Sequence, residues 1–148
     1  MLHKAFILGA GLGTRLRPLT NVLPKPLVPV FHEPMANYAL RHCQSAGISE
    51  FAINTHHIPD AWQKTYPTGE FAGCPLRFFH EPILLETGGG IRNIASFIGT
   101  DPLLVYNGDI FTDINISRLI EAHEQSGNIA TLALRSHGAN CNVNISGK

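Results

Sequence analysis

The chain has 148 residues, 44% of them hydrophobic, and its formal net charge at pH 7 is zero. This length and composition suit one globular domain over residues 1–148 with a core of its own. A balanced charge gives no reason to expect a nucleic acid or a membrane surface as partner, so we expect a small-molecule ligand. The three cysteines lack both zinc spacing and an even count, which is typical of a reduced, cytoplasmic protein.

Apolar runs alternate with helical stripes along the first half of the chain. Residues 4–8 form a short apolar run ending in glycine, as expected for a strand buried on both faces of a sheet. Small and apolar residues then recur at helical spacing over residues 35–46, between a proline and a glycine. Residues 50–55 predict a second strand, and residues 59–66 predict a short helix that a proline stops.

The same alternation continues in the second half. Residues 76–80 predict a third strand, and the glycines at 88–90 precede a predicted helix. Residues 103–106 predict a fourth strand, residues 116–127 a helix, and residues 129–134 a fifth strand. This order predicts an α/β fold with a largely parallel sheet, whose ligand crevice lies at the carboxyl ends of the strands.

A glycine-rich segment, GAGLGTRLRPLTNVLPKP at residues 9–26, directly follows the first predicted strand. Its third glycine comes one place too early for a dinucleotide fingerprint, and Pro18 curtails any helix there. The sequence Gly13-Thr14-Arg15 also lacks the Gly-Lys-Ser/Thr of a P-loop. What remains is a glycine loop whose backbone amides, together with the Arg15 guanidinium, suit a chain of phosphates.

Lys25 stands between two prolines in the same segment. Pro24 has a fixed φ, and residues that precede proline are biased toward extended conformations, so the backbone at Lys25 is predicted to be extended and stiff. A stiff backbone suits a cation that binds a phosphate, because the chain loses less conformational entropy when the ligand binds. A solvated lysine in a proline-rich loop is an equally good interpretation of the local sequence.

Asp109 is the third candidate, because it follows the fourth predicted strand after Asn107 and Gly108. It therefore lies at the same sheet edge as the glycine loop, where a carboxylate can hold Mg²⁺ together with substrate phosphates. Its alternative role is to cap the turn into the next helix. Asp113 is as well suited to a turn or helix entry as to a second metal ligand, so we do not include it in the site.

Two further pairs of polar residues receive weaker assignments. His56 and His57 are adjacent, so at a strand end they face opposite ways and make a poor metal pair. Glu81 and Glu86 flank a loop from which either could touch a ligand hydroxyl, but we expect both to be solvated loop carboxylates.

These motifs carry a resemblance to a known family. GLGTRLRPLT at residues 11–20, followed by PKPLVPV at 24–30, resembles the signature of the sugar-1-phosphate nucleotidylyltransferases, the nucleotidyl transferase family. LLVYNGD at 103–109 resembles the metal-binding strand end of that family, and the resemblance covers nearly the whole chain. HEP at 80–82 with LETGGG at 85–90 is most similar to a branch of N-acetylmuramate 1-phosphate uridylyltransferases and mannose-1-phosphate guanylyltransferase-like proteins.

The resemblance implies a fold, a reaction and a catalytic set. The fold would be the N-terminal part of a Rossmann-like, three-layer α/β/α nucleotide-diphospho-sugar transferase with a largely parallel mixed sheet. The reaction would transfer a nucleoside monophosphate from an NTP, with UTP favoured, to a sugar 1-phosphate, giving an NDP-sugar and pyrophosphate. Arg15 and Lys25 would neutralise the phosphates, and Asp109 would bind the Mg²⁺ cofactor that bridges them.

The resemblance also implies a nucleotide-binding set. Gly11 would approach the nucleoside, the Thr87-Gly88 turn would border the base, and Asn107 would lie by the ribose or the sugar. The complete implied set is Gly9, Ala10, Gly11, Gly13, Thr14, Arg15, Lys25, Thr87, Gly88 and Asn107.

Two other functions stay open: a non-catalytic regulatory subunit that senses nucleotide sugars, and an enzyme similar to the phosphocholine cytidylyltransferases. Family catalytic domains are longer, and their second metal-binding aspartate and sugar-gripping acidic residue lie beyond the segment that corresponds to Leu134. We therefore expect the 148 residues to be the NTP-binding portion of a longer enzyme, which alone binds NTP weakly and turns over little. Asn142, where relatives often carry a glycine beside the sugar, leaves the identity of the sugar open.

Overall fold

The computed structural model describes residues 2–135, so Asn142 lies outside the described residues. The chain divides into two compact units, of which the first ends at Ile114 and the second begins at Asn115. All the residues of the predicted site belong to the first unit.

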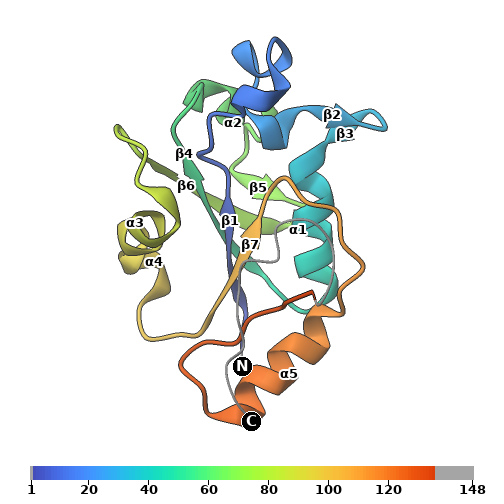
Figure 1. The fold of residues 1–148 in the computed structure, drawn as a ribbon, viewed down its shortest axis with the longest axis vertical. Helices are drawn as coiled ribbons and strands as arrows, with labels where there is room; N and C mark the ends of the chain where they lie inside the picture. Colours follow the sequence, from blue (N-terminus) through green and yellow to red (C-terminus); the bar gives the residue numbers. More distant parts are fainter. Residues whose placement is uncertain (1, 136–148) are drawn as a thin grey trace. The chain divides into compact units, whose positions relative to one another are not determined.

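The first unit is built on a five-stranded sheet with the strand order β5-β6-β4-β1-β7 (Figure 1). Its strands are β1 (Lys4–Leu8), β4 (Glu50–Thr55), β5 (Glu70–Phe71), β6 (Cys74–His80) and β7 (Leu103–Asn107). β1 pairs in parallel with β4 and β7, β4 pairs in parallel with β6, and β5 joins β6 antiparallel. The prediction of a largely parallel sheet is confirmed, and the carboxyl ends of β4, β1 and β7 lie side by side.

Helices cover both faces of this sheet. They are α1 (Met35–Ser45), α2 (Pro59–Thr65), α3 (Glu86–Asn93) and α4 (Ala95–Ile98), with a separate small hairpin of β2 (Pro29–Val30) and β3 (Glu33–Pro34). Figure 1 shows α1 on one side of the sheet and α3 and α4 on the other. On the latter side Phe6 and Ala52 pack against Ile94 and Phe97. The first unit is therefore a three-layer α/β/α structure, as the resemblance implied.

Helix α1 follows the sequence prediction closely because its start, its end and its apolar stripe all agree. It begins directly after Pro34 and is followed by Gly47, whose φ of 91° ends the helical conformation. Its buried residues recur at the spacing of one helix face: Ala36, Ala39, Leu40 and Cys43. Complete burial raises the pKa of the Cys43 thiol to about 12.

We expect Cys43 to react far more slowly with iodoacetamide than the half-buried Cys74 in the native protein at pH 8. The thiolate is the reactive species, and Cys43 holds almost none of it at that pH. Peptide mass spectrometry after timed alkylation measures both rates, and alkylation in urea is the control that makes them similar. Equal native rates would contradict the buried position of Cys43.

Three local predictions differ from the structure. The glycines at 88–90 lie inside α3 and not before it, because the helix already begins at Glu86. The helix then breaks at Ile94, so that α3 and α4 are separate. Lys25 does not continue an extended segment but opens the 3₁₀ turn Lys25–Leu27, in which the Leu27 N–H donates to the Pro24 carbonyl at 2.9 Å. Two further 3₁₀ turns, Thr14–Leu16 and Leu19–Asn21, precede it.

The second unit contains α5 (Ile116–Ser126). The Asn115 side chain caps this helix by accepting from the Arg118 N–H, and Gly127 ends it with a φ of 64°. The strand predicted over 129–134 is wrong. Ile129 is fully exposed, and the described residues give this stretch no paired strand. An apolar run without a hydrogen-bonding partner does not form a sheet, whatever its propensity.

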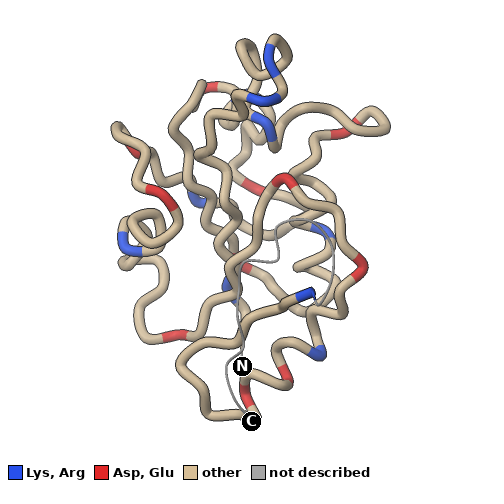
Figure 2. The backbone as a smooth tube through the Cα atoms, viewed as in Figure 1, with Lys and Arg blue, Asp and Glu red and all other residues tan. Residues whose placement is uncertain are grey.

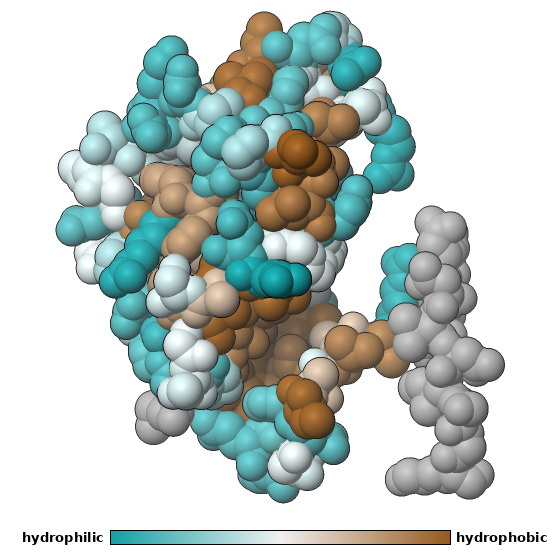
Figure 3. Space-filling model, turned by 90° about the vertical axis from the view of Figure 1, so that its left-hand side faces the viewer, coloured by the Kyte–Doolittle hydropathy of each residue, from teal (hydrophilic) through white to brown (hydrophobic). Residues whose placement is uncertain are grey.

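Neither one sign of charge nor apolar side chains predominate among the described residues. Figure 2 shows basic and acidic positions interspersed along the chain, apart from a basic group in the segment that follows β1. Figure 3 shows apolar side chains among hydrophilic ones on the side of the molecule it views. The most exposed apolar side chains of the first unit are on loops: Phe31, Ile83 and Val22. None of the helices in residues 2–135 combines the length and hydropathy needed to cross a membrane.

Candidate functional site

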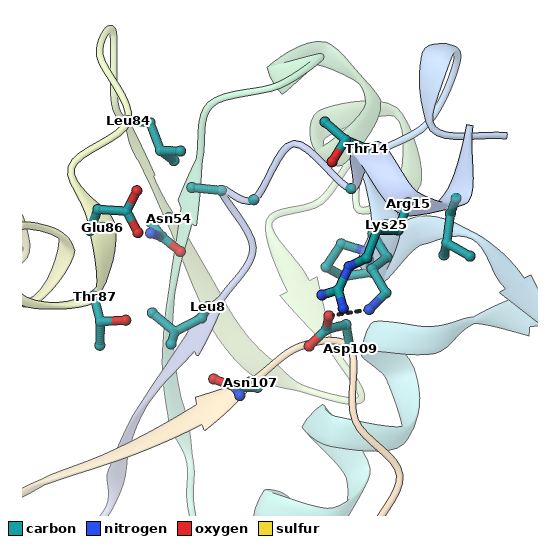
Figure 4. A pocket seen from close by; sticks show the side chains of 15 residues that line it. Leu8, Thr14, Arg15, Lys25, Asn54, Leu84, Glu86, Thr87, Asn107 and Asp109 are labelled. Atoms are coloured by element: carbon teal, nitrogen blue, oxygen red, sulfur yellow. Dashed lines mark hydrogen bonds and ion pairs between the residues drawn. The ribbon is translucent and has the colours of Figure 1, made fainter. Parts of the chain in front are cut away.

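A cavity of about 330 Å³ opens at the carboxyl edge of the sheet in the first unit. Figure 4 shows Arg15, Lys25 and Asp109 close together on one side, and Glu86 and Thr87 across the cavity from them. The complete lining is Leu8, Ala10, Gly11, Gly13, Thr14, Arg15, Leu16, Lys25, Pro26, Asn54, Leu84, Glu86, Thr87, Asn107 and Asp109. The loops after β1 and β7 and the start of α3 therefore contribute to one cavity.

An ion pair joins two charged candidates, Lys25 and Asp109, that lie 84 residues apart in the sequence. The Lys25 Nζ is 2.6 Å from the Asp109 Oδ2, and the two side chains are 29% and 31% exposed. The contact is short enough for a charge-assisted hydrogen bond. Because no acidic residue lies between Lys4 and Glu33, Asp109 brings a carboxylate to an otherwise basic stretch that includes Arg15.

The backbone around Lys25 is fixed by a turn and by burial. Besides the bond from Leu27 to Pro24, the Val28 N–H donates to the Lys25 carbonyl at 3.1 Å. Pro26 and Leu27, which belong to this turn, are buried. The backbone at Lys25 therefore forms a hydrogen-bonded 3₁₀ turn and not the extended conformation predicted from the flanking prolines.

Gly13 sets the path of the glycine loop before Arg15. Its φ is 61°, in the left-handed region that other residues rarely adopt, and a Cβ there would lie 2.8 Å from the Thr20 Cγ2. The Thr20 hydroxyl donates to the Gly13 carbonyl at 2.8 Å, and the Leu16 N–H donates to the same oxygen at 2.9 Å. Hydrogen bonds within the segment therefore stabilise the loop, and Thr14 and Arg15 face the cavity (Figure 4).

Asp109 is positioned by the pairing of β7 with β1. Leu8 pairs with Asn107, and the Gly108 N–H then donates to the Leu8 carbonyl at 3.1 Å. A Cβ on Gly108 would lie 2.9 Å from that carbonyl oxygen, so the two backbones approach as closely as a glycine permits. The next helix is capped by Asn115, and the side-chain contact of Asp109 in the described residues is the ion pair with Lys25.

One assignment of a polar residue near the opposite wall is wrong. Glu86 is exposed, as expected, but Glu81 is fully buried and is not a solvated loop carboxylate. Its Oε1 accepts from the Asn54 Nδ2 at 2.8 Å, and its Oε2 accepts from the Leu85 N–H at 3.0 Å. The His56 Nδ1 lies 2.7 Å from the Glu81 carbonyl oxygen and must donate to it.

Most of the predicted site residues line this one cavity. The exceptions are Gly9, which is pressed against β4, and Gly88, which lies in the first turn of α3. Lining residues outside the predicted set are Leu8, Leu16, Pro26, Asn54, Leu84 and Glu86. Of these, Asn54 had a usable signal, because it is a polar residue that follows the apolar middle of a strand and lies close to its carboxyl end.

Among the described residues, Asp109 is the one carboxylate next to the basic residues of this cavity, and a metal ion needs more ligands than that. The other carboxylate of the lining, Glu86, lies across the cavity (Figure 4). No group of three or more His, Cys, Asp or Glu side chains within residues 2–135 could hold a metal ion together. Asp113 lines a different hollow, beside Tyr38. His57 is also committed elsewhere, since its Nε2 donates to the Thr20 carbonyl at 2.6 Å.

The fold and the cavity define an α/β protein with its candidate ligand site at the carboxyl edge of a largely parallel sheet. The chain belongs to the Nucleotidyl transferase family, whose sequence pattern matches residues 4–140. This confirms the resemblance that the glycine-loop and strand-end motifs carried.

Individual relatives agree with this membership. The chain is 33% identical over 130 residues to a mannose-1-phosphate guanylyltransferase from Mycobacterium tuberculosis, covering 88% of this chain and 36% of that protein. It is 38% identical over 115 residues to an N-acetylmuramate alpha-1-phosphate uridylyltransferase from Neisseria meningitidis, covering 77% and 50%. The crystal structure of HddC from Yersinia pseudotuberculosis with GMP-PN has a TM-score of 0.72 at 25% identity, covering 82% and 54%. The chain thus spans between about a third and a half of the length of these curated relatives.

Proposed function

We propose that the full-length protein is a Mg²⁺-dependent sugar-1-phosphate nucleotidylyltransferase and that residues 1–148 supply the NTP-binding portion of its single catalytic domain. The observation that carries the proposal is the meeting of Lys25 and Asp109, 2.6 Å apart, in a cavity bordered by the glycine loop and Arg15. A sensor of nucleotide sugars has no need for this lysine and aspartate together with Arg15.

The reaction brings two anions together. An oxygen of the sugar 1-phosphate attacks the α-phosphorus of the NTP, a new P–O bond forms, and the bond to the β-phosphate breaks so that pyrophosphate leaves. Positioning and charge neutralisation supply most of the catalysis of such a transfer, and no protein nucleophile is required. Arg15 and the amides of the glycine loop hold the β- and γ-phosphates, and Lys25 neutralises charge between the α-phosphate and the incoming sugar phosphate.

Asp109 suits the cofactor that this reaction class uses. Mg²⁺ is usually held by one or two carboxylates plus substrate phosphates, with water in its remaining positions. A single carboxylate that lines the cavity beside the phosphate-binding residues fits that pattern. When bound, Mg²⁺ would neutralise the charge on the phosphates.

UTP is the nucleotide we favour, and an N-acetylated sugar 1-phosphate is the first acceptor to test. The support is the relative from Neisseria meningitidis, named as an N-acetylmuramate alpha-1-phosphate uridylyltransferase, which is 38% identical over the matched residues. The relative from Mycobacterium tuberculosis, named as a mannose-1-phosphate guanylyltransferase, supports GTP and mannose 1-phosphate as the second combination.

We expect isotope to exchange between labelled pyrophosphate and UTP in the full-length protein, dependent on both Mg²⁺ and a sugar 1-phosphate. Chromatographic separation of labelled UTP measures the exchange, with GTP and CTP as parallel arms and EDTA as the control. Exchange that requires CTP and phosphocholine would replace the proposal with the cytidylyltransferase alternative. No exchange with any acceptor, together with metal-independent binding of an NDP-sugar, would favour the regulatory subunit.

A further inference from the structure

Glu81 is a fully buried carboxylate at the end of β6, outside the cavity lining. Within residues 2–135 no ion pair involves it, and the polar contacts of its two carboxyl oxygens are hydrogen bonds. Burying a carboxylate without a counter-ion is unfavourable unless its oxygens are fully bonded. Because the burial of Glu81 is unfavourable, we looked for a structural role of this side chain other than packing.

A chain of hydrogen bonds runs from this carboxylate to the glycine loop. The Asn54 Oδ1 accepts from the Gly9 N–H at 2.7 Å, while the Asn54 Nδ2 donates to the Glu81 Oε1 at 2.8 Å. An N–H can only donate and a carboxylate can only accept, so the Asn54 amide has one satisfactory orientation. On the far side the Glu81 Oε2 accepts from the Leu85 N–H, at the loop that leads into α3.

Two glycines pack closely against Asn54 and Glu81, where a side chain would be crowded. A Cβ on Gly90 of α3 would lie 3.1 Å from both the Asn54 Nδ2 and the Glu81 Oε1. A Cβ on Gly9 would lie 2.8 Å from the Asn54 carbonyl oxygen. The glycine loop and α3 therefore both approach the Asn54–Glu81 pair as closely as their backbones allow.

We propose that Glu81 and Asn54 are positioning residues that hold the two walls of the cavity at a fixed separation. One wall is the glycine loop, bonded at Gly9; the other is the segment Leu84–Thr87, bonded at Leu85. Because both walls are held before a ligand arrives, an NTP binds a preformed cavity and less ordering opposes its binding. This inference rests on the proposed function for the identity of the ligand, but the coupling of the walls does not depend on it.

A pair of isosteric substitutions tests the inference. In Glu81→Gln the new amide N–H₂ cannot satisfy both Asn54 and Leu85, so one bond of the chain is lost. In the double variant Asn54→Asp, Glu81→Gln every bond returns. The carboxylate introduced on β4 accepts from Gly9 and from the glutamine amide, whose oxygen accepts from Leu85. The matched control is Glu70→Gln, which removes the same charge from an exposed side chain on β5.

We expect Glu81→Gln to raise the Kd for UTP roughly tenfold, which corresponds to about 1.4 kcal/mol, with a larger change in KM than in kcat. The double variant should recover most of that loss, and Glu70→Gln should bind as the parent does. Amide exchange measured by NMR should accelerate in Glu81→Gln at Gly9 as well as at Leu85, although Glu81 contacts only the latter. A folded Glu81→Gln protein with lower thermal stability but unchanged Kd and unchanged exchange at Gly9 would overturn the inference.

The remaining outcomes also decide the matter. If the parent binds no NTP, the proposed function fails, and faster exchange at both amides in Glu81→Gln still supports the coupling of the walls. If only the double variant folds and binds, that rescue supports the inference. If neither variant folds, the parent protein decides: a shared opening free energy at Gly9 and Leu85 supports the coupling, and independent exchange rates overturn it.

Discussion

Replacing Lys25 by alanine is expected to reduce pyrophosphate–UTP exchange in the full-length protein by about 10²–10³-fold, the range for loss of one preorganised charge-stabilising group. The substitution removes the cation that contacts Asp109 and leaves Arg15 as the remaining basic side chain among the described residues of the cavity. The initial exchange rate at saturating Mg²⁺ measures the effect. Arg17→Ala is the matched control, because it removes an exposed positive charge from the same segment but outside the cavity lining.

A comparison with Lys25→Arg separates charge from geometry. Arginine keeps the charge but presents a planar, longer group, so it should restore only part of the rate. The melting temperature of each variant excludes unfolding as the cause. Full activity of a folded Lys25→Ala protein would remove Lys25 from the reaction and with it the observation on which the proposed function rests.

Replacing Gly9 by alanine is expected to lower the free energy of unfolding by about 1–3 kcal/mol, the usual range for overpacking. The new Cβ would lie 2.7 Å from the Trp62 Cζ2 and 2.8 Å from the Asn54 carbonyl oxygen. Trp62 is fully buried and the carbonyl belongs to a central strand, so neither can move away easily. Urea unfolding followed by fluorescence of Trp62, the single tryptophan of the sequence, measures the change.

Gly88→Ala is the stability control for this substitution. A Cβ at Gly88 meets nothing within 4 Å, and the residue lies in α3, where alanine is favoured over glycine by about 0.5–1 kcal/mol. The two alanine variants should therefore change stability in opposite directions. If both leave the urea midpoint where it is, the close approach of the glycine loop to β4 does not exist in solution.

The sequence predicted those elements whose signals are local and agree with one another. Residues 35–46 combine an apolar stripe with a proline before it and a glycine after it, and α1 has nearly the predicted bounds. The apolar runs at residues 4–8 and 50–55 are strands for the same reason. Arg15, Lys25 and Asp109 could be brought together because parallel strands place their carboxyl ends at a common edge.

The failures have tertiary causes. Glycine opposes helix formation locally, so the start of α3 was placed too late; Gly90 is needed there because of its contact with Asn54 and Glu81. The burial of Glu81 follows from two bonding partners that no local pattern around it encodes. Residues 129–134 have the composition of a strand, but composition alone does not supply a pairing partner.

The pairing of β7 with β1 also determines when the candidate site comes into existence during folding. Lys25 and Asp109 are 84 residues apart in sequence, and their contact requires β7 to have docked on a strand near the N-terminus. Contacts between residues so far apart in sequence form late in folding, because closing the long intervening loop costs entropy before the contact can stabilise the fold. A nascent chain therefore carries the glycine loop, the lysine and their phosphate-binding groups well before it has a complete cavity. A ligand that requires the complete cavity stabilises this last long-range contact, so ligand binding and completion of the fold are thermodynamically linked.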